Sequence, residues 1–219
     1  MKVGVFGGTF NPIHNGHLRA AEEVREKLGF DRILFIPSGK PPLKTKDIAV
    51  AAHRFEMARL AILDNPFFEI SDIETKRAGK SYTVKTIEEL KKAYPSREFY
   101  LILGIDAFLD IPNWRHPERL IALANFVIIS RPGSRFADLR LSPYIRKTNR
   151  HTLKRIDDLK QDVYATALES GKETVLLGIT PIGISSTNIR NALKDGKSIK
   201  YLLPAELQSY IIRNKVYKS

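Results

Sequence analysis

The chain has 219 residues, of which 43% are hydrophobic and 27% charged, so its length suits one domain with a substantial core. No stretch approaches the roughly 20 apolar residues of a membrane span, and the absence of cysteine excludes disulfides and thiol chemistry. The formal net charge of +12 favours anionic partners, which include nucleotides and nucleic acid.

Strand and helix patterns alternate along the whole chain. In chain order they predict a strand at Val3–Phe6, a helix at Gly16–Leu28 ended by Gly29, a strand at Arg32–Ile36, a loop at Pro37–Lys46, a helix at Val50–Leu63, a strand at Phe67–Ile70, a helix at Tyr82–Tyr94, strands at Phe99–Leu103, Phe126–Ile129 and Val175–Leu177, and helices at Ser186–Leu193 and Pro204–Asn214. Such alternation predicts a single α/β domain, residues 1–219, with an open parallel sheet and helices on both faces.

A glycine-rich turn follows the first predicted strand and carries two histidines at the start of a helix. The turn reads Gly7-Gly8-Thr9-Phe10-Asn11-Pro12-Ile13-His14-Asn15-Gly16-His17. Glycine lets the backbone approach a ligand closely, and a helix N-terminus attracts anions, so the turn is suited to a phosphate chain. It lacks the G-x-G-x-x-G fingerprint of dinucleotide sites, and two histidines three apart with no cysteine are not a zinc ligand set.

Other chemistry-bearing residues follow later predicted strands. Gly104-Ile105-Asp106 and Arg131-Pro132-Gly133 both come directly after a strand, so we expect them to gather with the histidine turn at the carboxyl edge of the sheet. Near the C-terminal end, Ile184-Ser185-Ser186-Thr187-Asn188-Ile189-Arg190 begins a helix. There we expect Ser186 to be the N-cap and Arg190 to lie on the same helix face.

These motifs resemble those of a known family. His14-Asn15-Gly16-His17 resembles the H-x-G-H element of nucleotidyltransferases, which class I aminoacyl-tRNA synthetases share, and residues 184–190 resemble their I-S-S-T-x-I-R motif. The loop at residues 41–44 resembles their P-P-H-K loop, but Leu43 replaces the histidine, so only Lys44 carries over. Ser81-Tyr82-Thr83 and Gly104-Ile105-Asp106 with Asn113-Trp114 are similar to elements of bacterial nicotinate mononucleotide adenylyltransferases.

The resemblance implies a Rossmann-like fold and an enzyme that moves AMP from ATP to nicotinate mononucleotide in NAD biosynthesis. It implies Mg²⁺ bound with the ATP phosphates, and no metal site made by the protein. The implied catalytic residues are His14, His17, Lys44 and Arg190. The implied ATP-binding residues are Gly7, Gly8, Thr9, Phe10, Gly16, Gly104, Asp106, Arg131, Ile184, Ser185, Ser186 and Thr187. The implied binding residues for the pyridine nucleotide are Tyr82, Thr83, Trp114 and Arg115.

One segment exceeds the short connection that we expect in this family, and we interpret residues 134–172 as an insert. Ser142–Arg155 has five basic residues and no acidic one. Leu153, Ile156, Leu159, Val163 and Ala167 are spaced as on an amphipathic helix, which we expect to mediate self-association or to cover a sheet edge.

Parts of the sequence are also compatible with two other functions. Phosphopantetheine adenylyl transfer shares the chemistry, but the chain length, the Ser-Tyr-Thr element and Trp114 disfavour it. The basic insert and the synthetase-like element suggest RNA binding, but we see no K-M-S-K-S element or RNA-binding motif, so we do not expect nucleic acid as a partner. We expect no signal peptide, no membrane contact and a cytoplasmic location; whether the chain forms a homo-oligomer stays open.

Overall fold

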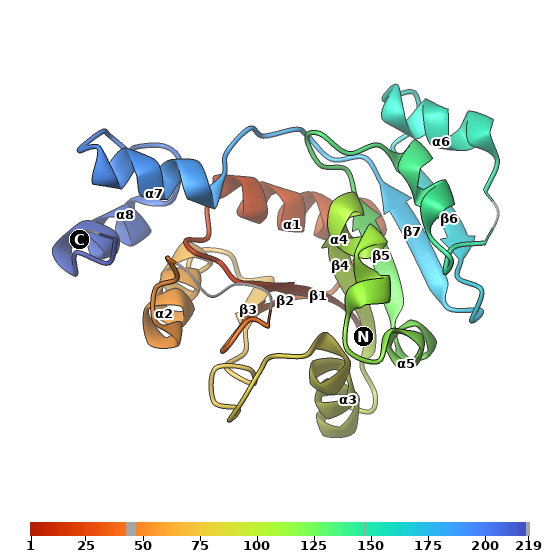
Figure 1. Ribbon diagram of the computed structural model, residues 1–219, viewed down its shortest axis with the longest axis horizontal. Helices are drawn as coiled ribbons and strands as arrows, with labels where there is room; N and C mark the ends of the chain where they lie inside the picture. Colours follow the sequence, from red (N-terminus) through yellow and green to blue (C-terminus); the bar gives the residue numbers. More distant parts are fainter. Residues whose placement is uncertain (43–46, 147, 218–219) are drawn as a thin grey trace.

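The computed structural model describes residues 1–42, 47–146 and 148–217, which build one seven-stranded sheet with helices around it (Figure 1). Across the sheet the strands are β3 (Phe68–Ile70), β2 (Arg32–Pro37), β1 (Lys2–Gly8), β4 (Glu98–Gly104), β5 (Asn125–Ile129), β7 (Glu173–Leu177) and β6 (Val163–Ala167). Every neighbouring pair is parallel except β6 and β7. The segments that follow β1, β4 and β5 therefore meet at one edge of the sheet.

Two apolar layers cover the two faces of the sheet, because side chains alternate along each strand. One layer packs α3 (Thr83–Ala93), α4 (Ile105–Leu109), α5 (Pro117–Leu123) and α6 (Arg150–Asp157) against the sheet. The other packs α1 (Asn15–Leu28), α2 (Ala51–Ala61), α7 (Ser186–Lys194) and α8 (Ala205–Arg213). This confirms the predicted fold class, an α/β sheet with helices on both faces.

The predicted helix boundaries hold where a local signal marks them. Gly29 ends α1 with a φ of 62°, the left-handed conformation that glycine adopts without strain. The second predicted helix is shorter than expected, since α2 ends at Ala61 and Leu63 is 65% exposed. The sequence patterns did not indicate the short elements α4, α5, η1 (Ile111–Asn113) and η2 (Phe136–Leu141).

The amphipathic helix predicted through Val163 and Ala167 is wrong in its second half. Helix α6 stops at Asp157, and Leu159 has a φ of 57°, so the chain turns there and cannot continue as a helix. Residues Val163–Ala167 instead form β6, which pairs antiparallel with β7 and makes the sheet mixed rather than purely parallel. A β-branched and aromatic run of Val, Tyr and Thr suits a strand at least as well as a helix.

Residues 134–172 are part of the domain core. Phe136, Leu139, Leu153, Ile156 and Leu168 are each 1% exposed or less and belong to the same apolar layer as α3 and α5. Together with β6 they cover the β7 side of the sheet (Figure 1). Among the described residues, no helix is long and apolar enough to cross a membrane.

Candidate active site

The turn between β1 and α1 leaves backbone open at the carboxyl edge of the sheet. A Cβ atom built on Gly7 would meet no other atom within 4 Å, so a ligand can approach its backbone closely. At Gly8 the same atom would lie 2.9 Å from the ring of Phe10, which requires glycine there. The turn therefore pairs an accessible backbone at Gly7 with a buried Phe10, which is only 3% exposed.

His14 and His17 lie together at the N-terminus of α1. Their ring centroids are 3.8 Å apart, and the His14 amide donates to Nδ1 of His17 at 3.3 Å. Gly16 keeps this arrangement open, since a Cβ there would lie 3.1 Å from Nδ1 of His14. Glycine inside the H-x-G-H element therefore leaves room for the first imidazole, which would have to shift by a few tenths of an ångström to make space for a Cβ.

The His14 imidazole is buried and neutral. It is 6% exposed, and its side chain faces the His17 amide in a capping box at the start of α1. Burial, with a smaller effect from the nearby Arg131 guanidinium, lowers the pKa of His14 to about 4. A neutral imidazole keeps one N–H, which can donate a hydrogen bond to a bound anion.

Helix α7 is fastened to the histidine turn by two of its own side chains. Nη1 of Arg190 donates to the carbonyl of Asn11 at 2.9 Å, and the Ser186 hydroxyl donates to the carbonyl of Pro12 at 2.8 Å. The prediction of Ser186 as N-cap is wrong: Ser185, whose backbone is extended, accepts from the Asn188 amide at 3.1 Å. The two distant motifs thus meet, as the family resemblance implies.

Two charged groups follow the next two strands. Nη1 of Arg131, after β5, donates to Oδ2 of Asp106, after β4, at 2.8 Å, and both side chains are about half exposed. Gly104 permits this pair, because a Cβ there would lie 2.7 Å from Oδ1 of Asp106. The Arg131 guanidinium is close enough to His14 to contribute to its lowered pKa.

A second group of predicted residues surrounds the start of α3. Tyr82 is the residue before α3, and the Arg115 guanidinium lies 6.0 Å from the centroid of its ring. Trp114 is half-buried against the same apolar layer as Tyr82, and its indole N–H donates to Oδ2 of Asp110 at 3.0 Å. One indole edge is thus fixed. None of the contacts described joins this group to the histidine turn, and Lys44 lies outside the described residues.

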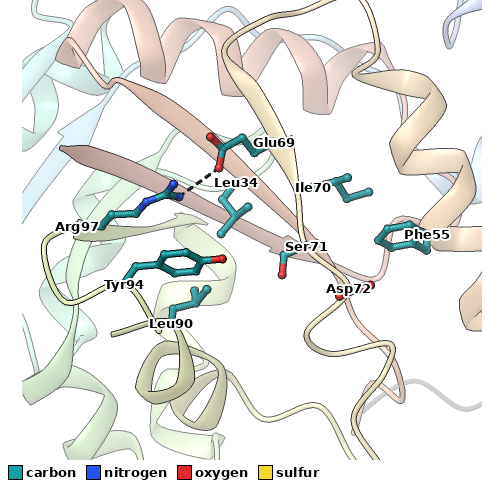
Figure 2. Close-up of a pocket in the computed structure, with 9 residues that line it drawn as sticks. All are labelled: Leu34, Phe55, Glu69, Ile70, Ser71, Asp72, Leu90, Tyr94 and Arg97. Atoms are coloured by element: carbon teal, nitrogen blue, oxygen red, sulfur yellow. Dashed lines mark hydrogen bonds and ion pairs between the residues drawn. The ribbon is translucent and has the colours of Figure 1, made fainter. Parts of the chain in front are cut away.

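A separate cavity of about 270 Å³ lies between the β2–β3 side of the sheet and helices α2 and α3 (Figure 2). Its lining includes Leu34, Tyr94 and the ion pair between Glu69 and Arg97, whose atoms are 3.2 Å apart. None of the residues predicted from the sequence for the site lines this cavity. The predicted site at the ends of β1, β4 and β5 is therefore separate from this cavity. We call its charged and imidazole groups the strand-end cluster: His14, His17, Asp106, Arg131 and Arg190.

Comparisons with known proteins agree with the motifs. A family model described as cytidylyltransferase-like matches residues 5–192. A probable nicotinate-nucleotide adenylyltransferase of Geotalea daltonii is 43% identical over 218 residues, covering 99% of this chain and 98% of its own; one of Syntrophotalea carbinolica is 44% identical over 227 residues, covering 100% and 98%. The chain belongs to the nicotinate-nucleotide adenylyltransferases. This confirms the family resemblance and the adenylyltransferase activity in NAD biosynthesis predicted from the sequence.

Solved structures support the fold of this adenylyltransferase. The Plasmodium falciparum nicotinic acid mononucleotide adenylyltransferase complexed with NaAD has a TM-score of 0.72 at 20% identity, covering 99% of this chain and 97% of its own. The same enzyme complexed with APC has a TM-score of 0.70 at 20% identity, covering 99% and 96%. At this identity the likeness establishes the Rossmann-like fold alone.

Sequence reasoning missed residues that hold the adenylyltransferase's histidine turn in place. The Asn11 side chain donates to the carbonyl of Asp47 at 2.7 Å and accepts from the Ala49 amide at 3.0 Å. Its Oδ1 also accepts from the Tyr217 hydroxyl at 2.9 Å, so the last described residue of the chain reaches the turn. Asn11 lies within the glycine-rich turn, but nothing in the sequence around Tyr217 indicates this contact.

The charged and imidazole groups at the strand ends include one carboxylate. Among the described residues there is no group of three or more histidine, aspartate or glutamate side chains that could hold a metal ion. Asp106 is the carboxylate of the strand-end cluster, which otherwise offers His14, His17, Arg131 and Arg190. Mg²⁺ is commonly held through substrate phosphates and waters and not by an all-protein cage.

Proposed function

We propose that adenylyl transfer takes place where β1, β4 and β5 end, with ATP on the histidine turn and nicotinate mononucleotide on the Tyr82–Trp114 side. The observation that carries this placement is the pair of His14 and His17 imidazoles, whose ring centroids are 3.8 Å apart, beside the open backbone of Gly7. A phosphate oxygen bound there would accept from an imidazole N–H.

In the proposed reaction, an oxygen of the 5′-phosphate of nicotinate mononucleotide attacks the α-phosphorus of ATP. A new P–O bond forms, and the bond between the α-phosphorus and the oxygen that it shares with the β-phosphorus breaks. Pyrophosphate leaves with the electron pair of that bond. Deamido-NAD is the other product. A phosphate monoester has a second pKa of about 6, so the nucleophile is already ionised near neutral pH and needs no general base.

Catalysis then depends on positioning two polyanions and stabilising the charge on the leaving pyrophosphate. We assign His14, His17, Arg190 and Lys44 to that task as hydrogen-bond donors and positive charges. Because the pKa of His14 is lowered, His14 contributes a neutral N–H and does not transfer a proton near neutral pH. Arg190 suits phosphate because its planar guanidinium makes paired contacts, and its bond to the Asn11 carbonyl holds it at the turn.

The ATP-binding residues are assigned on the same grounds. The backbone from Gly7 to Phe10, with Gly16, would border the phosphates, and Ile184–Thr187 would border them from α7. Gly104, Asp106 and Arg131 would meet the nucleoside, with Asp106 accepting hydrogen bonds from ribose hydroxyls. Mg²⁺ bound to the ATP phosphates supplies positive charge to the leaving group. We assign the protein no metal ligand of its own.

For the acceptor, we propose that the pyridine ring stacks on Trp114. Its carboxylate would meet the backbone N–H groups near Tyr82 and Thr83, and Arg115. The indole of Trp114 is anchored by Asp110, so its ring is held in one orientation for stacking. Arg115 lies close to Tyr82, which places a positive charge beside the proposed carboxylate site. We place the enzyme in the cytoplasm, where ATP, its proposed co-substrate, is maintained.

The assay for this proposal is pyrophosphate release with ATP and Mg²⁺, using nicotinate mononucleotide, nicotinamide mononucleotide and phosphopantetheine as acceptors in parallel. We expect the highest kcat/KM with nicotinate mononucleotide, and a product with the mass of deamido-NAD. Release that depends on phosphopantetheine, or equal use of the two mononucleotides, would contradict the proposed acceptor site.

A further inference from the structure

A buried arginine on α2 connects three backbone segments around the site. Arg54 is 1% exposed, and its guanidinium donates to four carbonyls: Ala49 at 2.9 Å, Thr9 at 2.9 Å, Gly39 at 2.8 Å, and Ser38. Within the described chain it forms no ion pair, although the buried Glu74 is close enough to act on its pKa, which burial of the guanidinium lowers. A buried cation is costly unless it is hydrogen-bonded, so its carbonyl contacts help to hold it there.

The segment that accepts two of these bonds is held from its other side by Ser81. The Ser81 hydroxyl accepts from the amides of Gly39 at 2.9 Å and Lys40 at 3.2 Å, and the Ser81 amide donates to the Lys40 carbonyl at 2.9 Å. Ser81 is 7% exposed. Residues 38–40 thus give carbonyls to Arg54 and amides to Ser81; we call these three residues the joint.

The joint has little freedom to move. A Cβ on Gly39 would lie 2.1 Å from the carbonyl oxygen of Glu74, so the joint is pressed against the backbone there. At its start, the Ser38 amide donates to the carbonyl of Gly8 at 2.8 Å. One end of the joint is therefore bonded to the turn proposed for ATP, and the other to the residue directly before Tyr82.

We propose that Arg54 and Ser81 are positioning residues, which set the spacing between the ATP turn and the pyridine-nucleotide site through the joint. This inference rests on the proposed function. Neither side chain needs to touch a substrate. In a reaction that depends on in-line placement of two bound polyanions, a displacement of about 1 Å can cost on the order of 100-fold in rate. The joint is a hydrogen-bonded connection between the two sites.

A positioning role affects how the two bound substrates are placed relative to each other, and not how tightly each one binds. Ser81→Ala removes the acceptor for two amides of the joint, while Gly7, His14 and Trp114 are left unchanged. Each substrate should therefore still bind, with its KM within about threefold of wild type. The 5′-phosphate of nicotinate mononucleotide should be in line with the α-phosphorus of ATP less often, so kcat should fall by about tenfold or more. Arg54→Lys keeps the charge but cannot reach four carbonyls, and should lower kcat at least as far.

Ser142→Ala is the matched control. Ser142 is 9% exposed, its hydroxyl accepts from the Tyr144 amide at 3.3 Å, and it lies in residues 134–172, away from the joint. The three variants and wild type are compared by kcat and by KM for ATP and for nicotinate mononucleotide, well below each melting temperature. The folded fraction is measured by circular dichroism at the assay temperature. If Arg54→Lys does not fold, Ser81→Ala decides the question.

We expect a fall in kcat per folded molecule for Ser81→Ala and none for Ser142→Ala. Equal kcat values for these two variants, when wild type is active, would overturn the positioning role alone. A fall explained entirely by the folded fraction, or a loss confined to KM, would overturn it as well. A wild-type protein that releases no pyrophosphate from ATP and nicotinate mononucleotide would instead contradict the proposed function.

Discussion

Burial of the neutral His14 imidazole makes stability depend on pH, and this dependence can be worked out from the structure. Burial lowers the pKa of His14 from 6.5 to about 4. Below pH 6.5 the unfolded chain binds a proton that the folded chain does not bind until the pH nears 4. Stability must therefore fall as pH falls through this window. At pH 5 the loss from this group is about 2 kcal/mol, which lowers the melting temperature by about 4–8 °C.

The assay compares thermal unfolding of wild type and His14→Gln between pH 8 and pH 5. Glutamine does not titrate, so any fixed cost of the substitution appears at pH 8, and the added change at lower pH isolates the imidazole. We expect His14→Gln to gain about 2 kcal/mol relative to wild type as the pH falls to 5. His151→Gln, which removes an exposed histidine from residues 134–172, controls for the loss of a histidine. Parallel pH profiles for wild type and His14→Gln would refute the burial argument.

Four further substitutions test the proposed roles. His17→Ala should lower kcat by on the order of 10²–10³ with little change in melting temperature, since one preorganised donor is lost; near wild-type turnover would remove this residue from the site. Arg190→Lys should be nearly as poor as Arg190→Ala, because an ammonium cannot make the guanidinium's paired contacts; full activity of the lysine variant would leave only a charge effect. Trp114→Ala should raise KM for nicotinate and nicotinamide mononucleotides alike, since stacking does not distinguish them, and unchanged kinetics would assign Trp114 to the core. Tyr217→Phe should lower kcat/KM for ATP about fivefold, the value of one neutral hydrogen bond, whereas Tyr210→Phe, which loses a bond to His53 instead, should not.

The fold was predictable from the sequence where periodicity and punctuation agree. The strand ending at Gly8 is followed by a glycine turn and a helix that stops at Gly29, and each step has a local cause. The second half of residues 134–172 was not predictable in this way. Val163 and Ala167 continue the helical spacing of Leu153 and Ile156, but pairing with β7 decides their structure. A tertiary contact therefore outweighs the local pattern.

The same distinction between local sequence signals and tertiary contacts applies to the residues of the site. The histidine turn and Arg190 could be predicted to meet because each lies in a motif whose chemistry suits phosphate. The choice between Ser185 and Ser186 as N-cap depends on one backbone conformation that the sequence does not specify. Arg54 looked like one more helix cation among 36 lysines and arginines. Its burial follows from carbonyls of three segments meeting around α2, which no local pattern encodes.

The most direct test of the account is a crystal structure of the wild-type chain with a non-hydrolysable ATP analogue. We expect the phosphates to lie over Gly7, within hydrogen-bond distance of His14, and the ribose to lie near Asp106. We also expect the Arg190 guanidinium to contact phosphate while it remains next to Asn11. An analogue bound in the cavity lined by Leu34 and Tyr94 (Figure 2), with no contact to His14, would contradict the central claim that the histidine turn is the ATP site.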